Sequence, residues 1–261
     1  MKTTARFETK FRLSQSHYYQ VRNELLGAPM EADIYSREQA YLIRSLYFDD
    51  GDYQAYRDNL AGAWGRVKLR IRTYLPYPND RLSVELKSKK GGLTIKHSTF
   101  ISFAWYEHFM TDYRFPVNNN PVLIEFERQV LLNNLRPKVI VQYHRHGFRS
   151  RRSGDLRITF DHGVCSMWSK ELFPANCFFR QHMPGNVVLE IKHTGRQPLW
   201  VRDLVQKQGL HWIANSKYAQ SIERARPDVF YPALAQTGFA SQRDSGKLIS
   251  QHKFRMRGEN L

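Results

Sequence analysis

The segment Arg66-Val67-Lys68-Leu69-Arg70-Ile71-Arg72 alternates strictly between basic and aliphatic residues. Side chains on a β-strand point to its two faces in turn, so this segment predicts a strand with one basic face and one aliphatic face. Like charges on one face repel each other, and the repulsion disappears when an anion binds between them. The pattern therefore indicates an anion-binding strand.

The same alternation recurs along the chain, with charged residues on one face and mainly apolar residues on the other, in residues 6–12, 81–89, 155–161 and 186–192. An ordinary antiparallel sheet with one face in water would give a similar pattern for any one strand. The uniformly basic face of residues 66–72 favours a different arrangement. A sheet rolled with its charged face inward would line a cationic tunnel, with helices covering the apolar face outside.

Hydrophobic periodicity gives a coarse map of the remaining elements. It predicts irregular segments at 27–39 and 162–186 and an α+β fold with a mainly antiparallel sheet, because the strands do not alternate regularly with helices. Ser14 and Ser216 are predicted to begin helices as N-caps. The predicted strands are 7–13, 41–49, 66–74, 81–89, 93–101, 137–148, 155–161 and 186–193, and the predicted helices are 14–26, 52–60, 103–112, 121–134, 198–208 and 216–226.

The composition indicates an anionic partner. The chain has 261 residues, 40 Lys and Arg against 24 Asp and Glu, and a net charge of +16. A nucleic acid, an acidic membrane surface or a phosphate-rich ligand would suit this charge. The sequence contains no run of eighteen apolar residues and no apolar signal region, and its two cysteines do not form a disulfide framework. We expect a cytoplasmic protein without a transmembrane segment.

Three glutamates on the charged faces have a common spacing. Glu8, Glu85 and Glu190 each precede a lysine by two residues, so each carboxylate shares a face with that lysine. Such a carboxylate can simply pair with neighbouring cations. It can also hold Mg²⁺ or Mn²⁺ together with phosphate oxygens. Both interpretations stay open, and the three glutamates are the candidate metal ligands.

A set of short motifs resembles a known family when read in order. The motifs are Lys68-Leu69-Arg70-Ile71-Arg72, Glu85-Leu86-Lys87, Tyr143-His144-Arg145, Leu156 to Asp161, Leu189-Glu190-Ile191-Lys192 and Ser216-Lys217-Tyr218. Over residues 6–226 they resemble the VTC domain, the polyphosphate-polymerase branch of the CYTH-like triphosphate tunnel metalloenzymes. The resemblance implies a closed antiparallel barrel of about eight strands with helices packed outside. It also implies a tunnel domain at 1–226 and a C-terminal extension at 227–261.

The resemblance assigns phosphate-handling roles to residues on the charged faces. The implied catalytic cations are Arg70, Arg72, Lys87, Arg145 and Arg157. Glu190 matches the metal-binding glutamate of the family, which uses Mn²⁺ or Mg²⁺. The further substrate-binding candidates are Lys10, Lys68, Tyr143, Lys192, Ser216 and Lys217.

The implied activity is transfer of the terminal phosphoryl group of ATP to a growing polyphosphate chain. ATP or another triphosphate and polyphosphate are the expected partners, and no nucleic acid is required. A triphosphate hydrolase of the wider superfamily is the first alternative, since it differs only in the acceptor that reaches the terminal phosphate. A non-catalytic polyanion binder is the second. An RNA binder would more often expose aromatic side chains on the basic face.

Overall fold

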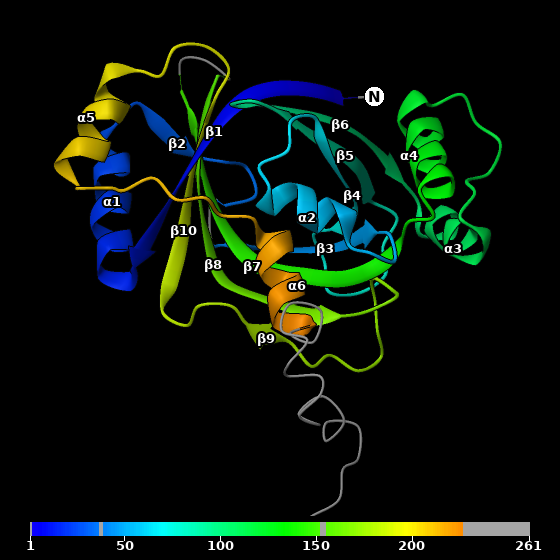
Figure 1. The fold of residues 1–261 in the computed structure, drawn as a ribbon. Coiled ribbons are helices and arrows are strands. Elements are labelled where there is room, and N and C mark those ends of the chain that lie inside the picture. The colour runs from blue at the N-terminus through cyan, green and yellow to red at the C-terminus, as the bar shows by residue number, and fades with distance from the viewer. Residues whose placement is uncertain (1, 37–38, 152–154, 227–261) are drawn as a thin grey trace, which may run out of the picture. The chain divides into compact units, whose positions relative to one another are not determined.

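The computed structural model describes residues 2–36, 39–151 and 155–226 of the chain (Figure 1). All the helices and strands discussed below lie in the compact unit Met1–Ala225. The predicted C-terminal extension, 227–261, lies outside the described residues. Within the described part of the chain, no helix is long and apolar enough to cross a membrane.

Eight strands of the described residues form a closed barrel, which confirms the predicted fold. They pair antiparallel in the order β7-β3-β4-β5-β6-β1-β10-β8, and β8 pairs back with β7. Closure leaves these strands without an unpaired edge. The eight strands are β1 (Lys2–Ser14), β3 (Tyr41–Asp49), β4 (Arg66–Thr73), β5 (Leu82–Lys90), β6 (Leu93–Ile101), β7 (Arg136–Ser150), β8 (Leu156–Trp168) and β10 (Asn186–His193).

Two short strands correct the predicted irregular segments. β2 (Met30–Ala32) pairs with β7 inside the segment predicted as a loop at 27–39. β8 continues to Trp168 and β9 (Arg180–Gln181) pairs with it, so the prediction of an irregular stretch at 162–186 is wrong in these places. The end of β8 lacks clear alternation in sequence. Its strand conformation comes from pairing with β7, as at Gln142 and Cys165.

Helices cover the aliphatic outer face of the barrel on two sides (Figure 1). Residues of α3 and α4, such as Phe109 and Phe126, pack on Ile71 and Val84 of the wall. On the other side, α1 and α5 pack on the outer faces of β1, β8 and β10. Fully burying an aliphatic side chain is worth about 1.5–3 kcal/mol, so this double-sided core stabilises the closed barrel. The helices are α1 (Gln15–Gly27), α2 (Gln54–Leu60), α3 (Phe103–Asp112), α4 (Pro121–Leu132), α5 (Leu199–Lys207) and α6 (Lys217–Ala225).

The two predicted serine caps are confirmed. Ser14 Oγ accepts a hydrogen bond from the backbone N–H of His17 at 3.1 Å, which satisfies a donor at the start of α1. Ser216 Oγ accepts from the backbone N–H of Ala219 at 3.2 Å. The second cap fixes where α6 begins, and therefore where Lys217, its first residue, points.

Candidate functional site

The charged faces of the strands line the inside of the barrel. The register places Arg70 opposite Glu85, Lys68 opposite Lys87, and Lys10 opposite Glu190, so the charged rows of neighbouring strands are adjacent. Many of these side chains are buried although they carry charge: Glu85 is 0% exposed and Arg145 is 6% exposed. Buried charges need compensating partners. The contacts that supply them fall into two networks.

The first network, the β4–β6 cluster, consists of Arg70, Arg72, Glu85 and Lys96. Glu85 accepts hydrogen bonds from Arg70 Nε at 2.8 Å and Arg70 Nη2 at 2.5 Å. Arg72 Nη1 lies 3.6 Å and Lys96 Nζ 3.4 Å from Glu85 Oε1. Burial by itself raises the pKa of Glu85, but Arg70, Arg72 and Lys96 outweigh it and hold that pKa well below its usual range. Glu85 is thus a permanent anion that orients three cations.

The second network, the β7–β10 cluster, consists of Arg145, Asp161, Glu190, Lys192 and Lys217. Arg145 forms a bidentate pair with Asp161 at 2.6 and 2.8 Å, and its Nη2 also lies 3.2 Å from Glu190 Oε2. Lys217 Nζ lies 2.5 Å from Asp161 and 2.8 Å from Glu190. Lys192 Nζ lies 2.6 Å from Glu190 Oε2. Asp161 and Glu190 therefore share two cations, Arg145 and Lys217.

Electrostatics keep both of these carboxylates ionised. Burial opposes ionisation of Glu190, but Lys192, Lys217 and Lys10 hold its pKa well below the usual range. Burial disfavours the charged form of Lys217 as well, yet Asp161 and Glu190 raise its pKa above the usual value. Burial and the positive charge of Arg145 together outweigh the attraction of Glu190 and lower the pKa of Lys192 well below its usual value.

Lys10, Lys87 and Glu8 form further contacts between β1, β5 and β10. Lys87 Nζ lies 2.8 Å from Glu8 Oε2, and Lys10 Nζ lies 3.9 Å from Glu190 Oε1. Lys10 Nζ also donates to the backbone oxygen of Asn215 at 2.5 Å. Burial lowers the pKa of Lys10 to about 8. These contacts place Lys10 beside the segment that leads into α6.

Lys68, Ser216 and Tyr143 lie at the same inner surface. Lys68 Nζ donates to Ser216 Oγ at 2.7 Å. The Tyr143 ring lies beneath two cations, with Arg145 Cζ at 5.3 Å and Lys217 Nζ at 4.9 Å from its centroid. A cation above an aromatic face is stabilised by the ring quadrupole, so Tyr143 orients both. His144 and His146 lie on the opposite face from Arg145; Tyr18 of α1 contacts His146 Nδ1 at 3.2 Å, so a helix covers this face at His146, whereas His144 is exposed.

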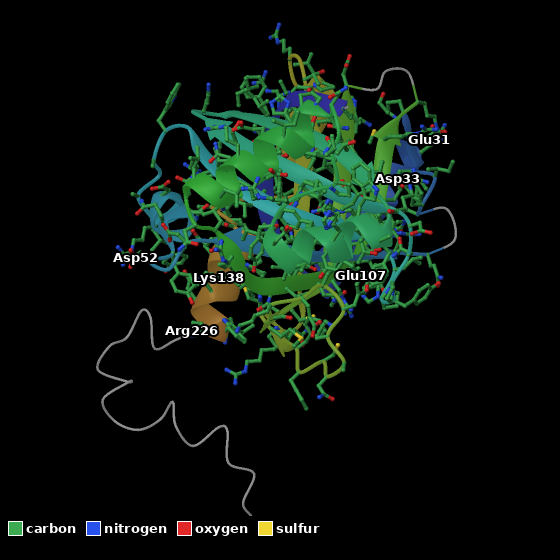
Figure 2. The ribbon with its side chains drawn as sticks, turned by 90° about the vertical axis from the view of Figure 1, so that its right-hand side faces the viewer. Glu31, Asp33, Asp52, Glu107, Lys138 and Arg226 are labelled. Atoms are coloured by element: carbon green, nitrogen blue, oxygen red, sulfur yellow. The ribbon has the colours of Figure 1, made fainter. Side chains whose placement is uncertain are left out.

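Arg157 lies apart from the other predicted catalytic cations. Its Nη2 pairs with the carboxylate of Asp33, which follows β2 and is labelled in Figure 2, and donates to Tyr41 Oη at 2.9 Å. Lys192 is its neighbour on β10. The side chain of Arg157 is 34% exposed, in contrast to the 7% of Arg145. Arg157 therefore faces the tunnel from a more open position.

Two acidic residues of this surface were not among the candidate site residues. The alternation in residues 155–161 places Asp161 on the charged face with Arg157, but the sequence did not assign it a partner or a role. Asp33 lies in a segment predicted to be irregular, and no sequence signal connects it with Arg157. Its role depends on the short β2–β7 pairing.

The carboxylates do not form a metal site by themselves. Among the described residues, no group of three or more His, Cys, Asp or Glu side chains is arranged to hold a metal ion. Mg²⁺ and Mn²⁺ commonly take one or two carboxylates and complete their shell with substrate phosphates and water. Glu190 and Asp161, which share Arg145 and Lys217, fit that second kind of site. The residues are therefore consistent with an ion that arrives with a phosphate ligand.

Positive charge exceeds negative charge along the inner surface. Five carboxylates in these contacts (Glu8, Asp33, Glu85, Asp161 and Glu190) face eleven basic side chains: Arg6, Lys10, Lys68, Arg70, Arg72, Lys87, Lys96, Arg145, Arg157, Lys192 and Lys217. An elongated anion with many oxygens would neutralise the excess. Arginine forks and lysine ammonium groups both bind phosphate oxygens by charge-assisted hydrogen bonds.

Comparisons with known proteins agree with this geometry. The family model of the VTC domain matches residues 5–226. A candidate adenylate cyclase from Bacillus halodurans has a similar structure, at a TM-score of 0.54 and 13% identity, covering 83% of this chain and 96% of that one. The PH1819 protein of Pyrococcus horikoshii OT3 gives a TM-score of 0.47 at 10% identity and covers 84% of this chain and 99% of that one. A search of curated proteins gave no match. The chain belongs to the VTC domain family and has a triphosphate-tunnel fold.

Proposed function

We propose that the barrel is a metal-dependent polyphosphate polymerase, which transfers the terminal phosphoryl group of ATP to a growing polyphosphate chain. The observation that carries the proposal is the β7–β10 cluster. There a buried, ionised Glu190 lies within 4 Å of the side-chain nitrogens of Lys10, Arg145, Lys192 and Lys217. The matching VTC family model supports the same assignment.

The chemistry needs positioning and charge neutralisation more than a protein nucleophile. Phosphoryl transfer passes through a loose transition state with charge spread over the equatorial oxygens. The bond between the terminal phosphorus and the bridging oxygen of ADP breaks, and a bond to a terminal oxygen of the acceptor chain forms. Preorganised cations stabilise this charge without reorganising during the reaction.

In this proposal each network has its own task. Arg70, Arg72 and Lys87 hold phosphate oxygens on the β4–β5 side, while Arg145 and Lys217 hold them on the β7–β8 side. Lys10, Lys68, Tyr143, Lys192 and Ser216 complete the phosphate path, and Arg157 binds the chain at a more exposed position. Glu190 would hold Mn²⁺ or Mg²⁺ with substrate phosphates, and the bound ion would neutralise charge on the reacting oxygens. Glu8 and Glu85, the other candidate ligands, are engaged by Lys87 and by Arg70.

The test is an incubation of the purified protein with ATP and Mn²⁺ or Mg²⁺. Products are resolved as polyphosphate on a gel, with free phosphate measured in parallel. We expect a polyphosphate ladder from the wild-type protein. Glu190→Gln should lower its formation by at least about 100-fold, since it removes the charge that would hold the ion. Glu107→Gln, the same change at an exposed helical position labelled in Figure 2, should have no effect.

The other outcomes identify the alternatives. Free phosphate without polymer would contradict the polymerase and indicate a hydrolase. If the protein forms neither polyphosphate nor free phosphate but still binds tripolyphosphate, it is not an enzyme of either kind and the tunnel only binds polyanions. Equal activity of Glu190→Gln and wild type would contradict the assignment of Glu190.

A further inference from the structure

A cavity of about 270 Å³ lies outside the barrel wall, between α2, the start of β4 and the end of α4. Its lining is about equally polar and apolar, and Phe48, Leu69 and Leu135 belong to the apolar part. Cavities that bind small molecules are commonly apolar with a few polar groups, and this one is large enough for a single flat ring system. None of the cations of the two tunnel clusters lines it.

The indole of Trp64 lies at this cavity and is 74% exposed. Lys90 Nζ lies 5.3 Å from the centroid of its ring. A tryptophan packed for stability would bury most of its large apolar surface. An accessible indole beside a cavity of mixed polarity is instead suited to stacking, and nucleobases stack well on tryptophan.

The polar part of the lining is rich in acceptors. Asp50 Oδ1 accepts from the backbone N–H of Gln54 at 2.9 Å, and Asp58 Oδ1 accepts from Gln54 Nε2 at 2.6 Å. Gln54 thereby fixes the orientation of both carboxylates, which line the cavity. Fixed carboxylate oxygens suit a ligand that presents N–H donors, such as the exocyclic amino group of adenine.

The cavity is directly adjacent to the phosphate-binding surface. Arg66 lines it and is also the first residue of the cationic row on β4. Lys68 follows two residues later, about 7 Å along the strand. Lys68 Nζ donates to Asn59 Oδ1 at 2.6 Å, and Asn59 follows Asp58 in α2. Lys68 faces the interior whereas Leu69 faces the cavity, so a triphosphate held at Lys68 would reach this cavity around the end of the barrel where β4 begins at Arg66.

We propose that this cavity is the nucleobase subsite for ATP, with the base stacked on Trp64 and its amino group donating to the carboxylates of Asp50 and Asp58. The inference rests on the proposed function, because it takes ATP as the phosphoryl donor. It adds a way for the protein to distinguish a nucleoside triphosphate from inorganic polyphosphate. The phosphates bind inside the barrel, and the base binds at the end of the barrel where β4 begins.

The experiment compares the binding of ATP with that of inorganic tripolyphosphate, which has no base. Calorimetric titration in EDTA prevents turnover, so the result does not depend on catalysis. Trp64→Ala should weaken ATP binding by about fivefold or more, because stacking on an aromatic ring is worth about 1–3 kcal/mol per base. Tripolyphosphate binding should change by less than about twofold, as for an ordinary surface substitution. Trp64→Phe should restore much of the ATP affinity.

The matched control is Trp168→Ala. Trp168 is also exposed, at 44%, and also lies under a lysine, with Lys170 Nζ 5.9 Å from its ring, but it does not line the cavity. Trp168→Ala should leave the affinities for ATP and for tripolyphosphate unchanged. Equal losses for ATP and tripolyphosphate in Trp64→Ala, or no loss for either, would overturn the subsite and leave the tunnel proposal intact. A wild-type protein that binds neither ligand, in EDTA or with Mg²⁺ present, would overturn the proposed function and the subsite with it.

Discussion

The two charged networks inside the barrel are built in different ways. The β4–β6 cluster comes entirely from neighbouring strands, since Arg70 faces Glu85 directly in the ladder and β6 adds Lys96. The β7–β10 cluster is incomplete without Lys217, which α6 delivers from outside the sheet. One network is fixed by strand register, and the other depends on the docking of a helix.

This difference indicates that the β4–β6 cluster mainly stabilises the barrel and that the β7–β10 cluster is the candidate reaction centre. In the β4–β6 cluster three cations converge on one carboxylate that is 1% exposed, so this network is satisfied without a ligand. In the β7–β10 cluster Asp161 and Glu190 share Arg145 and Lys217. A phosphate ligand could take over those shared cations and leave the carboxylates for a metal ion. We therefore expect the first cluster to contribute more to stability than the second, and the second to contribute more to phosphate binding than the first.

The largest effect on stability is expected for Glu85→Gln. The change leaves the buried side chains of Arg70, Arg72 and Lys96 without their anion. Breaking a buried ion pair from one side costs about 3–5 kcal/mol. The free energy of unfolding, measured by chemical denaturation at pH 7, should fall by that amount.

The control for Glu85 is Glu31→Gln, which breaks the exposed pair with Arg149 (Figure 2). An exposed pair of this kind contributes less than about 1 kcal/mol. Similar losses of stability in the two variants would contradict the scaffold role of the β4–β6 cluster.

Lys217→Met tests the helix-dependent network. The change removes a donor to phosphate and leaves Asp161 and Glu190 less neutralised, so both effects disfavour an anion. Hydrogen bonds to charged groups are worth about 1.5–3 kcal/mol, so tripolyphosphate affinity should fall by about 10-fold to 100-fold. The measurement is calorimetric titration in EDTA.

Lys96→Met is the matched change in the other cluster. Burial lowers the pKa of Lys96 to about 8, and its partner is Glu85, so it should contribute less to anion binding. A loss of tripolyphosphate affinity as large as that of Lys217→Met would contradict the division between the two clusters.

The smallest expected effect is on the pH dependence of stability. It concerns His182, whose backbone oxygen is bonded to α6. Its Nε2 lies 2.9 Å from Ser166 Oγ, and its backbone oxygen accepts from Arg224 of α6 at 2.7 Å. Burial lowers the pKa of His182 to about 4. The unfolded chain, with a pKa near 6.5, binds a proton first as the pH falls, so this contribution is complete above pH 6.5 and is lost toward pH 4.

His182→Gln should remove that pH dependence. The loss of unfolding free energy between pH 7 and pH 5 should be smaller in the variant by roughly 1–2 kcal/mol. Chemical denaturation at the two pH values measures it. An unchanged pH dependence would show that His182 titrates normally and does not contribute to acid sensitivity near α6.

The sequence by itself located the eight barrel strands and their faces, apart from the end of β8. Alternation in residues 66–72 identified which cations share the inner surface, and Ser14 and Ser216 marked the starts of their helices. These features are local, because the period of a strand and the geometry of an N-cap depend on residues two or three positions apart. The match of the predicted and observed bounds of β3, β6 and β10 follows from the same local rules.

Only the tertiary structure decided which charges meet. Lys217 and Glu190 are 27 residues apart, and Arg157 and Asp33 are 124 residues apart. No periodic pattern connects such positions, because their proximity results from barrel closure, from the short β2–β7 pairing and from the docking of α6. The cavity at Trp64 arises in the same way, where α2, β4 and α4 pack together. Local sterics therefore set the inner surface, and long-range packing set the candidate site on it.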